Sequence, residues 1–468
     1  MSFPLIAKNT LIQIIGRGFS TLFGLIALAA VTRYLGQEQF GWYTTVATFL
    51  QFFAVFADFG LTLIGAQMIA EPGADEDRLV SNLFSFRLIL STLFFGSAMV
   101  AIFFFPYHMT IKLGVLVLTG AFFAMTLQNI FMGVFQKHLR MSIAAWGDAL
   151  GRFIILVGYF LCIFFQLGLL PILAVSVAAN ATQFAFFFVA AKKIVKITWL
   201  TEWVIYKKIF SKSWPIAMSM GFNLIYLRAD TIILSLVRSQ AEVGLYGAAY
   251  RVIDVAASIP VMFMGIILPH LTSAWHADRA KFNHYFHRAF DFMCIIALPF
   301  VLGGIYLAKP AMAFLAGAEF AESGRYLQIL LIALWAIFFG ALSGHAIVAL
   351  NKQRLMIWGY IITAALTLIG YFIFIPRYGA IGAGWMTVFS EVLILILTFI
   401  VVEKTIRVWP SFAIFNKSLI SSISMLAAIY FIPMPHFVYS LLLAVFVYCA
   451  ALFLLKGMTK KMIMEIIK

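Results

Sequence analysis

Two neighbouring apolar stretches of the chain carry four charged residues of opposite sign. The segment 226–260 reads YLRADTIILSLVRSQAEVGLYGAAYRVIDVAASIP and contains Arg228, Asp230, Arg251 and Asp254. An arginine at the centre of a membrane helix costs about 2.5 to 3.5 kcal/mol on insertion scales. Because charges kept at such a cost mark ligand or ion pathways, these four positions are the first candidates for chemistry.

Arginine is the basic residue chosen at depth. A guanidinium group stays protonated and binds phosphate through a planar fork, whereas a buried lysine can become neutral. The set therefore indicates an aqueous or paired environment that favours anions. Arg152 and Arg87 lie within two turns of the inner ends of their spans and could instead reach the headgroups. The intramembrane arginines are Arg17, Arg87, Arg152, Arg228 and Arg251, and all except Arg152 are substrate-binding candidates.

Three aspartates share the apolar stretches and are candidates for ion coupling or charge pairing: Asp58, Asp230 and Asp254. Asp254 follows Arg251 by three residues on the same helical face, so the two could form a structural ion pair. Asp230 is two residues from Arg228 and points to a different face. It either pairs across helices or stands in a cavity where it could carry a proton. Nearer the membrane interfaces we place Asp148, Asp291 and Glu391.

The elements that must position these charges are membrane-spanning helices. The chain has 468 residues, of which 64% are hydrophobic and 11% charged, and its mean hydropathy is +1.02. Soluble domains have about 45 to 50% apolar and about 25% charged residues. A spanning segment must be helical, because its backbone groups find no water in the hydrocarbon core. The composition therefore predicts an all-α polytopic membrane protein.

Apolar runs separated by polar breaks predict fourteen spans. Around Pro171, and around Pro433 to Pro435, a proline could instead kink a single helix. The approximate ranges are 10–32, 42–70, 81–105, 112–136, 148–170, 171–191, 214–238, 246–273, 289–312, 326–350, 355–375, 381–402, 417–433 and 436–455.

Basic residues divide unevenly between the two sides of the predicted membrane. With the N-terminus inside, the inner segments hold 22 lysines and arginines and the outer loops hold 6. Cytoplasmic loops carry such an excess, so both termini are predicted to be cytoplasmic. The net charge of +15 is then an orientation signal beside anionic lipid, and it does not require a nucleic-acid partner.

The sequence contains no motif for metal binding or catalysis. Its three cysteines lie singly in apolar runs, which argues against a disulfide framework or a thiolate metal cluster. His284, His287 and Asp291 have helical spacing, but they sit among basic residues at an inner membrane surface. We therefore expect neither a metal site nor a cofactor.

Two pairs of similar motifs indicate an internal repeat. QEQFGWY at 37–43 matches QAEVGLY at 240–246, and FQKHLRM at 135–141 matches LNKQRLM at 350–356. We interpret them as two six-helix lobes in parallel repeat. The basic, aromatic segment between the lobes is typical of an amphipathic helix on the inner surface, or is an ordinary loop. The predicted parts are 1–191 (first lobe), 192–213 (linker), 214–402 (second lobe) and 403–468 (two further helices).

The chain resembles the polysaccharide transporter family, the O-antigen flippases of the multidrug and oligosaccharidyl-lipid exporter superfamily. The resemblance covers nearly the whole chain and is carried by the order and spacing of loose motifs. They are KNTLIQIIGRGFSTLFGLIALAAVTRYLGQEQFGWY at 8–43, FADFG at 56–60, the LNKQRLM loop, and IPRYGAIGAGW at 375–385.

The resemblance implies a two-lobed, V-shaped transporter like the multidrug exporters, with a central cationic cavity. It implies that undecaprenyl-pyrophosphate-linked oligosaccharide moves from the inner to the outer leaflet of the bacterial cytoplasmic membrane by alternating access, driven by an ion gradient. The product would enter O-antigen, capsule or exopolysaccharide synthesis, with a polymerase and a chain-length regulator as possible partners. The alternatives are a membrane-embedded polysaccharide polymerase or ligase, and an exporter of drugs or lysophospholipids.

Overall fold

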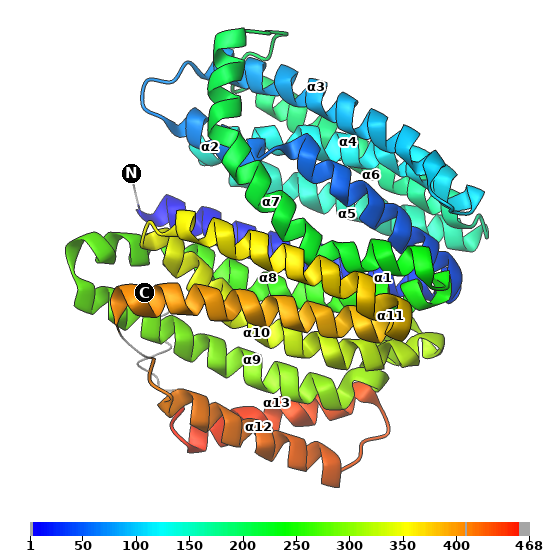
Figure 1. Ribbon diagram of the computed structural model, residues 1–468, viewed down its shortest axis with the longest axis vertical. Coiled ribbons are helices and arrows are strands. Elements are labelled where there is room, and N and C mark those ends of the chain that lie inside the picture. Colours follow the sequence, from blue (N-terminus) through cyan, green and yellow to red (C-terminus); the bar gives the residue numbers. More distant parts are fainter. Residues whose placement is uncertain (1–2, 408–409, 458–468) are drawn as a thin grey trace. The chain divides into compact units, whose positions relative to one another are not determined.

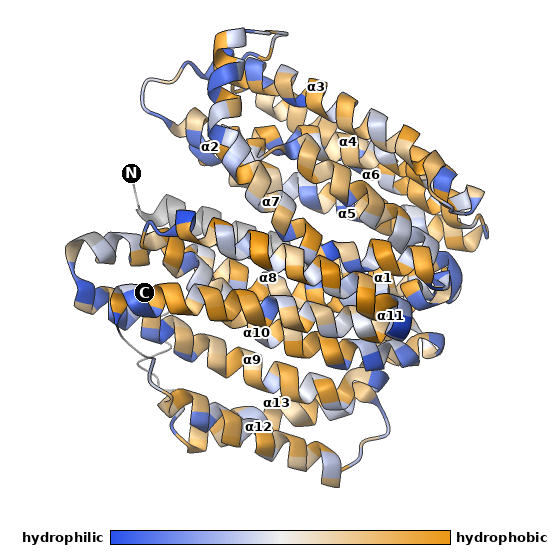
Figure 2. Cartoon of the chain, in the orientation of Figure 1, coloured by the Kyte–Doolittle hydropathy of each residue, from blue (hydrophilic) through white to orange (hydrophobic). Residues whose placement is uncertain are grey.

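The computed structural model describes the backbone of residues 3–407 and 410–457, with side chains from Leu22 onward except His276. Every regular element in this part of the chain is helical. Hydrophobic residues run along the lengths of the helices, and hydrophilic residues gather at the helix ends and connections (Figure 2). The expected all-α membrane fold is confirmed.

The helices fall into two compact units, Met1–Gly244 and Leu245–Lys468. In the first unit, α4 packs on α6, and α1 packs on α5. The lobe boundaries predicted at residues 191 and 214 stay a prediction. The elements of the first unit are α1 (Phe3–Asp58), α2 (Leu61–Ala70), α3 (Glu76–Ala101), η1 (Ile102–Phe104), α4 (Met109–Lys137), α5 (Met141–Phe164), α6 (Leu169–Lys192) and α7 (Trp203–Val237).

The second unit begins within α8 (Gln240–Ala277). Its α10 packs on both α9 and α11, and the final pair α12 and α13 lies beside α9 (Figure 1). Ser418 and Tyr448 hold this pair in place by bonding the backbone oxygens of Cys294 and Ile295 in α9. The remaining elements are α9 (Arg279–Ala316), η2 (Ala318–Glu322), α10 (Ser323–Ala349), α11 (Gln353–Ile406), α12 (Ala413–Phe431) and α13 (Phe437–Leu454).

Two of the long helices each contain two predicted spans. Gly36 interrupts α1 with φ 66°, and Gly379 interrupts α11 with φ 59°. Glycine adopts a positive φ without the steric cost that a side chain would impose. The described residues contain 12 helices long and apolar enough to cross a membrane. Counting α1 and α11 as two spans each gives the fourteen that the sequence predicts.

Both proline-containing pairs are separate helices. α5 ends at Phe164, and Pro171 lies in the first turn of α6, where its missing N–H is tolerated. Pro433 and Pro435 lie between the end of α12 and the start of α13. In contrast, the predicted amphipathic linker is not a separate helix. Its helical part begins at Trp203 and continues through Pro215 into the seventh span.

The two copies of the repeated outer motif touch each other within the first unit. A Cβ at Gly41 would lie 1.7 Å from the carbonyl oxygen of Gln240, and one at Gly244 would lie 2.0 Å from that of Gln37. Each glycine therefore faces the glutamine of the other copy. Small residues at such crossings let two membrane helices approach through their backbones. Thr45 Oγ1 adds a 2.8 Å hydrogen bond to Gln240 Oε1.

Candidate functional site

Arg87 lies in α3 and is completely buried. Its Nη2 donates to Asp58 Oδ1 and, at 2.7 Å, to Thr62 Oγ1, and the Thr62 hydroxyl also bonds the Asp58 carboxylate. No part of the Arg87 side chain is exposed, and 14% of the Asp58 side chain is. The alternative in which Arg87 reaches the headgroups is therefore wrong. Its expected contact with substrate, and the role of Asp58 in coupling, stay predictions.

Arg228 and Asp230 lie more than twenty residues into α7. Arg228 is half-buried and Asp230 is fully buried, which agrees with their expected positions on different faces of the helix. The Asp230 carboxylate accepts hydrogen bonds from the backbone N–H of Thr231 at 2.5 Å and from its hydroxyl at 3.1 Å. An arginine near the middle of the predicted span 214–238, with partial exposure, is suited to contact a polar group inside the membrane.

The other predicted arginines lie on three different helices. Arg251 and Asp254 are three residues apart on α8, in the second unit, and both are half-buried. Arg17 belongs to α1, and its side chain is outside the described residues. Arg152 is exposed on α5, with its Nη1 3.5 Å from where a Cβ at Gly24 would lie. Among the predicted site residues, Arg87 and Asp58 are thus in contact. The pair on α7 belongs to the first unit, and the pair on α8 belongs to the second.

Glu391 is a buried carboxylate that the sequence analysis misplaced. It lies twelve residues beyond Gly379, in the middle of the second half of α11, and only 8% of it is exposed. The two halves of α11 are in antiparallel register, because the Tyr371 hydroxyl lies 3.4 Å from Thr387 Oγ1. The same register places Thr367 opposite Glu391. Within the described residues, Glu391 Oε1 and Thr367 Oγ1 have no hydrogen-bond partner.

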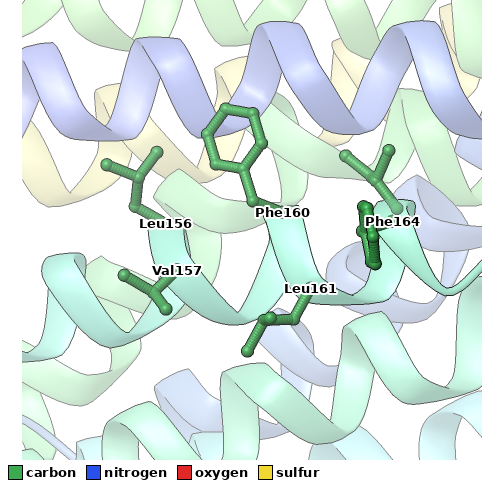
Figure 3. A pocket seen from close by; sticks show the side chains of 6 residues that line it. Leu156, Val157, Phe160, Leu161 and Phe164 are labelled. Carbon is green, nitrogen blue, oxygen red and sulfur yellow. The ribbon is translucent and has the colours of Figure 1, made fainter.

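A groove of about 540 Å³ lies along α5 and has no polar lining (Figure 3). Four of its residues are exposed large hydrophobics, as expected for a surface that faces lipid. It offers no group to bind phosphate, and we do not include it in the site. Its lining residues are Leu156, Val157, Phe160, Leu161, Ile163 and Phe164.

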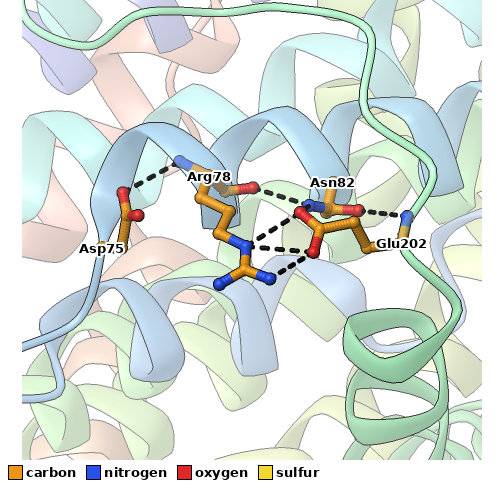
Figure 4. Close-up of polar contacts among 4 residues, drawn as sticks. All are labelled: Asp75, Arg78, Asn82 and Glu202. Atoms are coloured by element: carbon orange, nitrogen blue, oxygen red, sulfur yellow. Dashed lines mark hydrogen bonds and ion pairs between the residues drawn. The ribbon is translucent and has the colours of Figure 1, made fainter.

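Hydrogen bonds and an ion pair hold the segment before α7 against α3 (Figure 4). Arg78 Nε donates to Glu202 Oε1 at 2.8 Å, and the Glu202 backbone N–H donates to Asn82 Oδ1 at 2.9 Å. Hydrogen bonding to Arg78 lowers the pKa of Glu202 to about 2. Asp77 and Ser81 bond the same segment at Lys196 and Thr198. The aromatic start of α7, including the exposed Trp203, is thereby held beside the N-terminal end of α3.

The described residues contain no group of three or more histidine, cysteine, aspartate and glutamate side chains placed to hold a metal ion. Of the helically spaced residues His284, His287 and Asp291 on α9, His284 is exposed and the other two are partly buried.

Comparison with known proteins connects this arrangement to a class of transporters. Over 94% of this chain and 98% of the other, the fold matches the lipid II flippase MurJ in an inward closed conformation, with a TM-score of 0.77 and 16% identity. A multidrug resistance MATE family transporter in an inward-facing conformation matches 83% of this chain and 94% of its own, with a TM-score of 0.69 and 17% identity. The fold is that of the MurJ and MATE transporters.

Sequence comparisons then define the family. The profile of the polysaccharide biosynthesis protein family matches residues 6–275, more than half of the chain. The "Putative O-antigen transporter" of Shigella dysenteriae is 22% identical over 402 residues, which is 83% of this chain and 98% of that protein. The capsular polysaccharide biosynthesis protein CapF of Staphylococcus aureus is 20% identical over 274 residues, 58% of this chain and 69% of that protein. The chain belongs to the polysaccharide biosynthesis protein family, which confirms the resemblance seen in the sequence.

Proposed function

We propose that this protein is a flippase that moves undecaprenyl-pyrophosphate-linked oligosaccharide from the inner to the outer leaflet of the bacterial cytoplasmic membrane. The observation that carries the proposal is the half-buried Arg228, which lies in α7 near the middle of the predicted span 214–238. A pyrophosphate headgroup crossing the bilayer needs fixed positive charge, and a guanidinium supplies it together with oriented hydrogen bonds. The similarity to an O-antigen transporter supports this substrate class.

The proposed cycle is alternating access. The substrate enters from the cytoplasmic side, and Arg17, Arg228 and Arg251 bind its phosphates and acidic sugars. Both termini are cytoplasmic, as the distribution of basic residues indicates. A polymerase and a chain-length regulator would then use the substrate on the outer side.

Coupling to an ion gradient completes the proposal. Asp58, Asp230 and Asp254 are the carboxylates expected from the sequence, and the structure adds Glu391. An ionised carboxylate is costly to bury without a cation or hydrogen-bond donors. Because no partner reaches Glu391 Oε1 within the described residues, Glu391 is the strongest candidate to take up a coupling proton or cation.

The alternatives explain less of the molecule. A polymerase or ligase needs an external loop with catalytic residues, whereas the longest predicted outer connection, around Glu319 to Arg325, is a 3₁₀ turn and the start of α10. An exporter of cationic drugs would not benefit from arginine at mid-helix. The MATE-like fold is compatible with such an exporter. The charge of the transported molecule therefore distinguishes the two transport functions.

The test is complementation of a bacterial strain that lacks its own lipid-linked oligosaccharide flippase. Arg228→Ala is expected to abolish surface polysaccharide and to cause the lipid-linked intermediate to accumulate, while the protein inserts at normal levels. The matched control is Arg325→Ala, which removes an exposed arginine paired with Glu322 outside the membrane. Normal polysaccharide in the Arg228 variant would contradict the proposal.

A further inference from the structure

The second membrane span is interrupted close to its middle. α1 ends at Asp58, and α2 starts at Leu61. Between them Phe59 has φ 47° and Gly60 has φ 72°, so two successive residues adopt the left-handed conformation. A residue other than glycine seldom adopts this conformation, which persists only where surrounding contacts impose it. The break is therefore held by its neighbours.

Arg87 is the neighbour that contacts both sides of the break. Asp58 is the last residue of α1, and Thr62 is the second residue of α2. One guanidinium nitrogen of Arg87 donates to both of them. Since the side chain is fully buried, it does not offer a surface to a pyrophosphate headgroup. Its contacts point instead to control of the helix break.

The hydrogen bonding of Arg87 is incomplete. Within the described residues, its Nε and Nη1 are buried and have no acceptor, while Gln128 Oε1 on α4 is buried and has no donor. Such groups are rare in native proteins because each one forfeits its hydrogen bond to water. Arg87 and Gln128 therefore offer unpaired donors and an unpaired acceptor at the same depth. The Arg87 guanidinium has more than one possible hydrogen-bonding arrangement.

Helix register places Gln128 at the depth of Arg87. Ring contacts between α3 and α4 fix an antiparallel register: Phe84 with Phe131, and Phe95 with Phe122. Arg87 is three residues after the first of these contacts on α3, and Gln128 is three residues before it on α4. The close approach of Gly133 to Ala66, and of Gly114 to Val46, places the same part of α4 beside the break.

We propose that Arg87 is a positioning residue of the transport cycle: it clamps the two halves of the second span through Asp58 and Thr62, and Gln128 is the acceptor that its guanidinium gains when the break changes geometry. This inference rests on the proposed flippase function. Arg87 acts on the span and not on the substrate. The first unit then has a hinge of its own, inside a single membrane span.

The first variant to test is Gln128→Leu, which removes the second acceptor and leaves the Arg87–Asp58 pair intact. Purified protein is reconstituted into vesicles with undecaprenyl-pyrophosphate-linked oligosaccharide, and flipping rate, substrate affinity and melting temperature are measured. We expect the rate to fall about tenfold or more, the size of one hydrogen bond to a charged group, with affinity and melting temperature unchanged or higher. The matched control is Thr44→Val, because Thr44 Oγ1 is also buried without a partner.

A wild-type flipping rate in the Gln128 variant would overturn the proposed bond from Arg87 to Gln128. An Arg87–Asp58 pair that does not rearrange has no need of this acceptor. The second variant, Asp58→Leu with Arg87→Met, replaces the ion pair with apolar residues, a change that proteins often tolerate in stability. We expect it to insert and bind substrate but not to flip it. Flipping at the wild-type rate would overturn the clamp. If instead the wild-type protein does not flip the substrate in these vesicles, the proposed function itself fails.

Discussion

Asp58 and Glu391 are two acidic residues in membrane helices, one in each unit, and their surroundings are opposite. Asp58 ends a helix at a break and has an arginine and a threonine hydroxyl as partners. Glu391 lies within a regular helix, and its Oε1 has no partner in the described part of the chain. The cation that neutralises Asp58 is a side chain of the protein itself, Arg87. In the proposed mechanism, the second carboxylate, Glu391, takes up a proton or a cation from outside.

This difference separates a structural charge from an exchangeable one. Removing one member of a buried ion pair leaves an uncompensated charge and costs about 3 to 5 kcal/mol. Removing a buried carboxylate that has no cationic partner removes a desolvation cost instead. The two sites should therefore respond to substitution with opposite signs.

The largest effect on stability is expected for Arg87→Met, which removes the cationic partner of Asp58. Asp58 would keep its burial and lose its partner, so the free energy of unfolding should fall by about 3 to 5 kcal/mol. Thermal unfolding in detergent, with Arg325→Ala as the exposed control, measures this change. A melting temperature equal to that of the control would mean that Asp58 is not held by Arg87.

A matched pair of threonine variants sharpens the same comparison. Thr62→Val removes a hydroxyl that bonds both Asp58 and Arg87 and should cost about 1 to 3 kcal/mol. Thr367→Val removes a buried hydroxyl that has no partner among the described residues, and it should leave stability unchanged or higher. Equal losses in the two variants, measured by thermal unfolding, would show that the sites do not differ.

The exposed ion pair of Arg78 and Glu202 is expected to contribute much less to stability than the buried pair of Arg87 and Asp58. Because the pKa of Glu202 is lowered to about 2 from 4.5, its tie to Arg78 contributes fully above pH 4.5 and is lost as pH falls toward 2. Arg78→Ala should return this pKa toward 4.5 and speed hydrogen exchange at the Glu202 amide, with little effect on the melting temperature. Unchanged exchange would show that Arg78 does not hold the segment.

The smallest effect on stability is expected for Glu391→Gln. The amide keeps the shape and removes the ionisable group, so the melting temperature should be unchanged or higher. Transport should nevertheless lose its dependence on the ion gradient, which flipping assays with and without a proton or sodium gradient measure. A strong loss of stability would show that the ionised carboxylate has a partner, and gradient-dependent flipping would exclude Glu391 from coupling.

Much of the fold followed from the sequence because the membrane imposes one rule on every span. Apolar length predicted the fourteen spans, and the two kinks at Gly36 and Gly379 divide the long helices where the polar breaks lie. Of the two predicted pairs of repeat motifs, the outer pair is in contact through Gly41 and Gly244. The helix that contains the predicted span 214–238 begins earlier, at Trp203, because the surface segment and the span form one continuous helix, α7.

The site was only partly predictable. The pairing of Asp58 with Arg87 joins residues 29 positions apart on neighbouring helices, and no spacing rule within a helix connects them. The sequence signal for the break was Gly60 in FADFG, which we treated as a family motif only. Glu391 was placed too near the interface, although the predicted span 381–402 already put it at mid-depth.

The central claim is that this protein moves a pyrophosphate-linked oligosaccharide lipid across a bilayer. The direct measurement uses vesicles that contain the purified protein and undecaprenyl-pyrophosphate-linked oligosaccharide, with an external sugar-binding reagent that cannot cross the membrane. The proposed function predicts that nearly all of the lipid becomes accessible to the reagent with time, and more slowly with Arg228→Ala. An accessible fraction that stays equal to that of protein-free vesicles would contradict it.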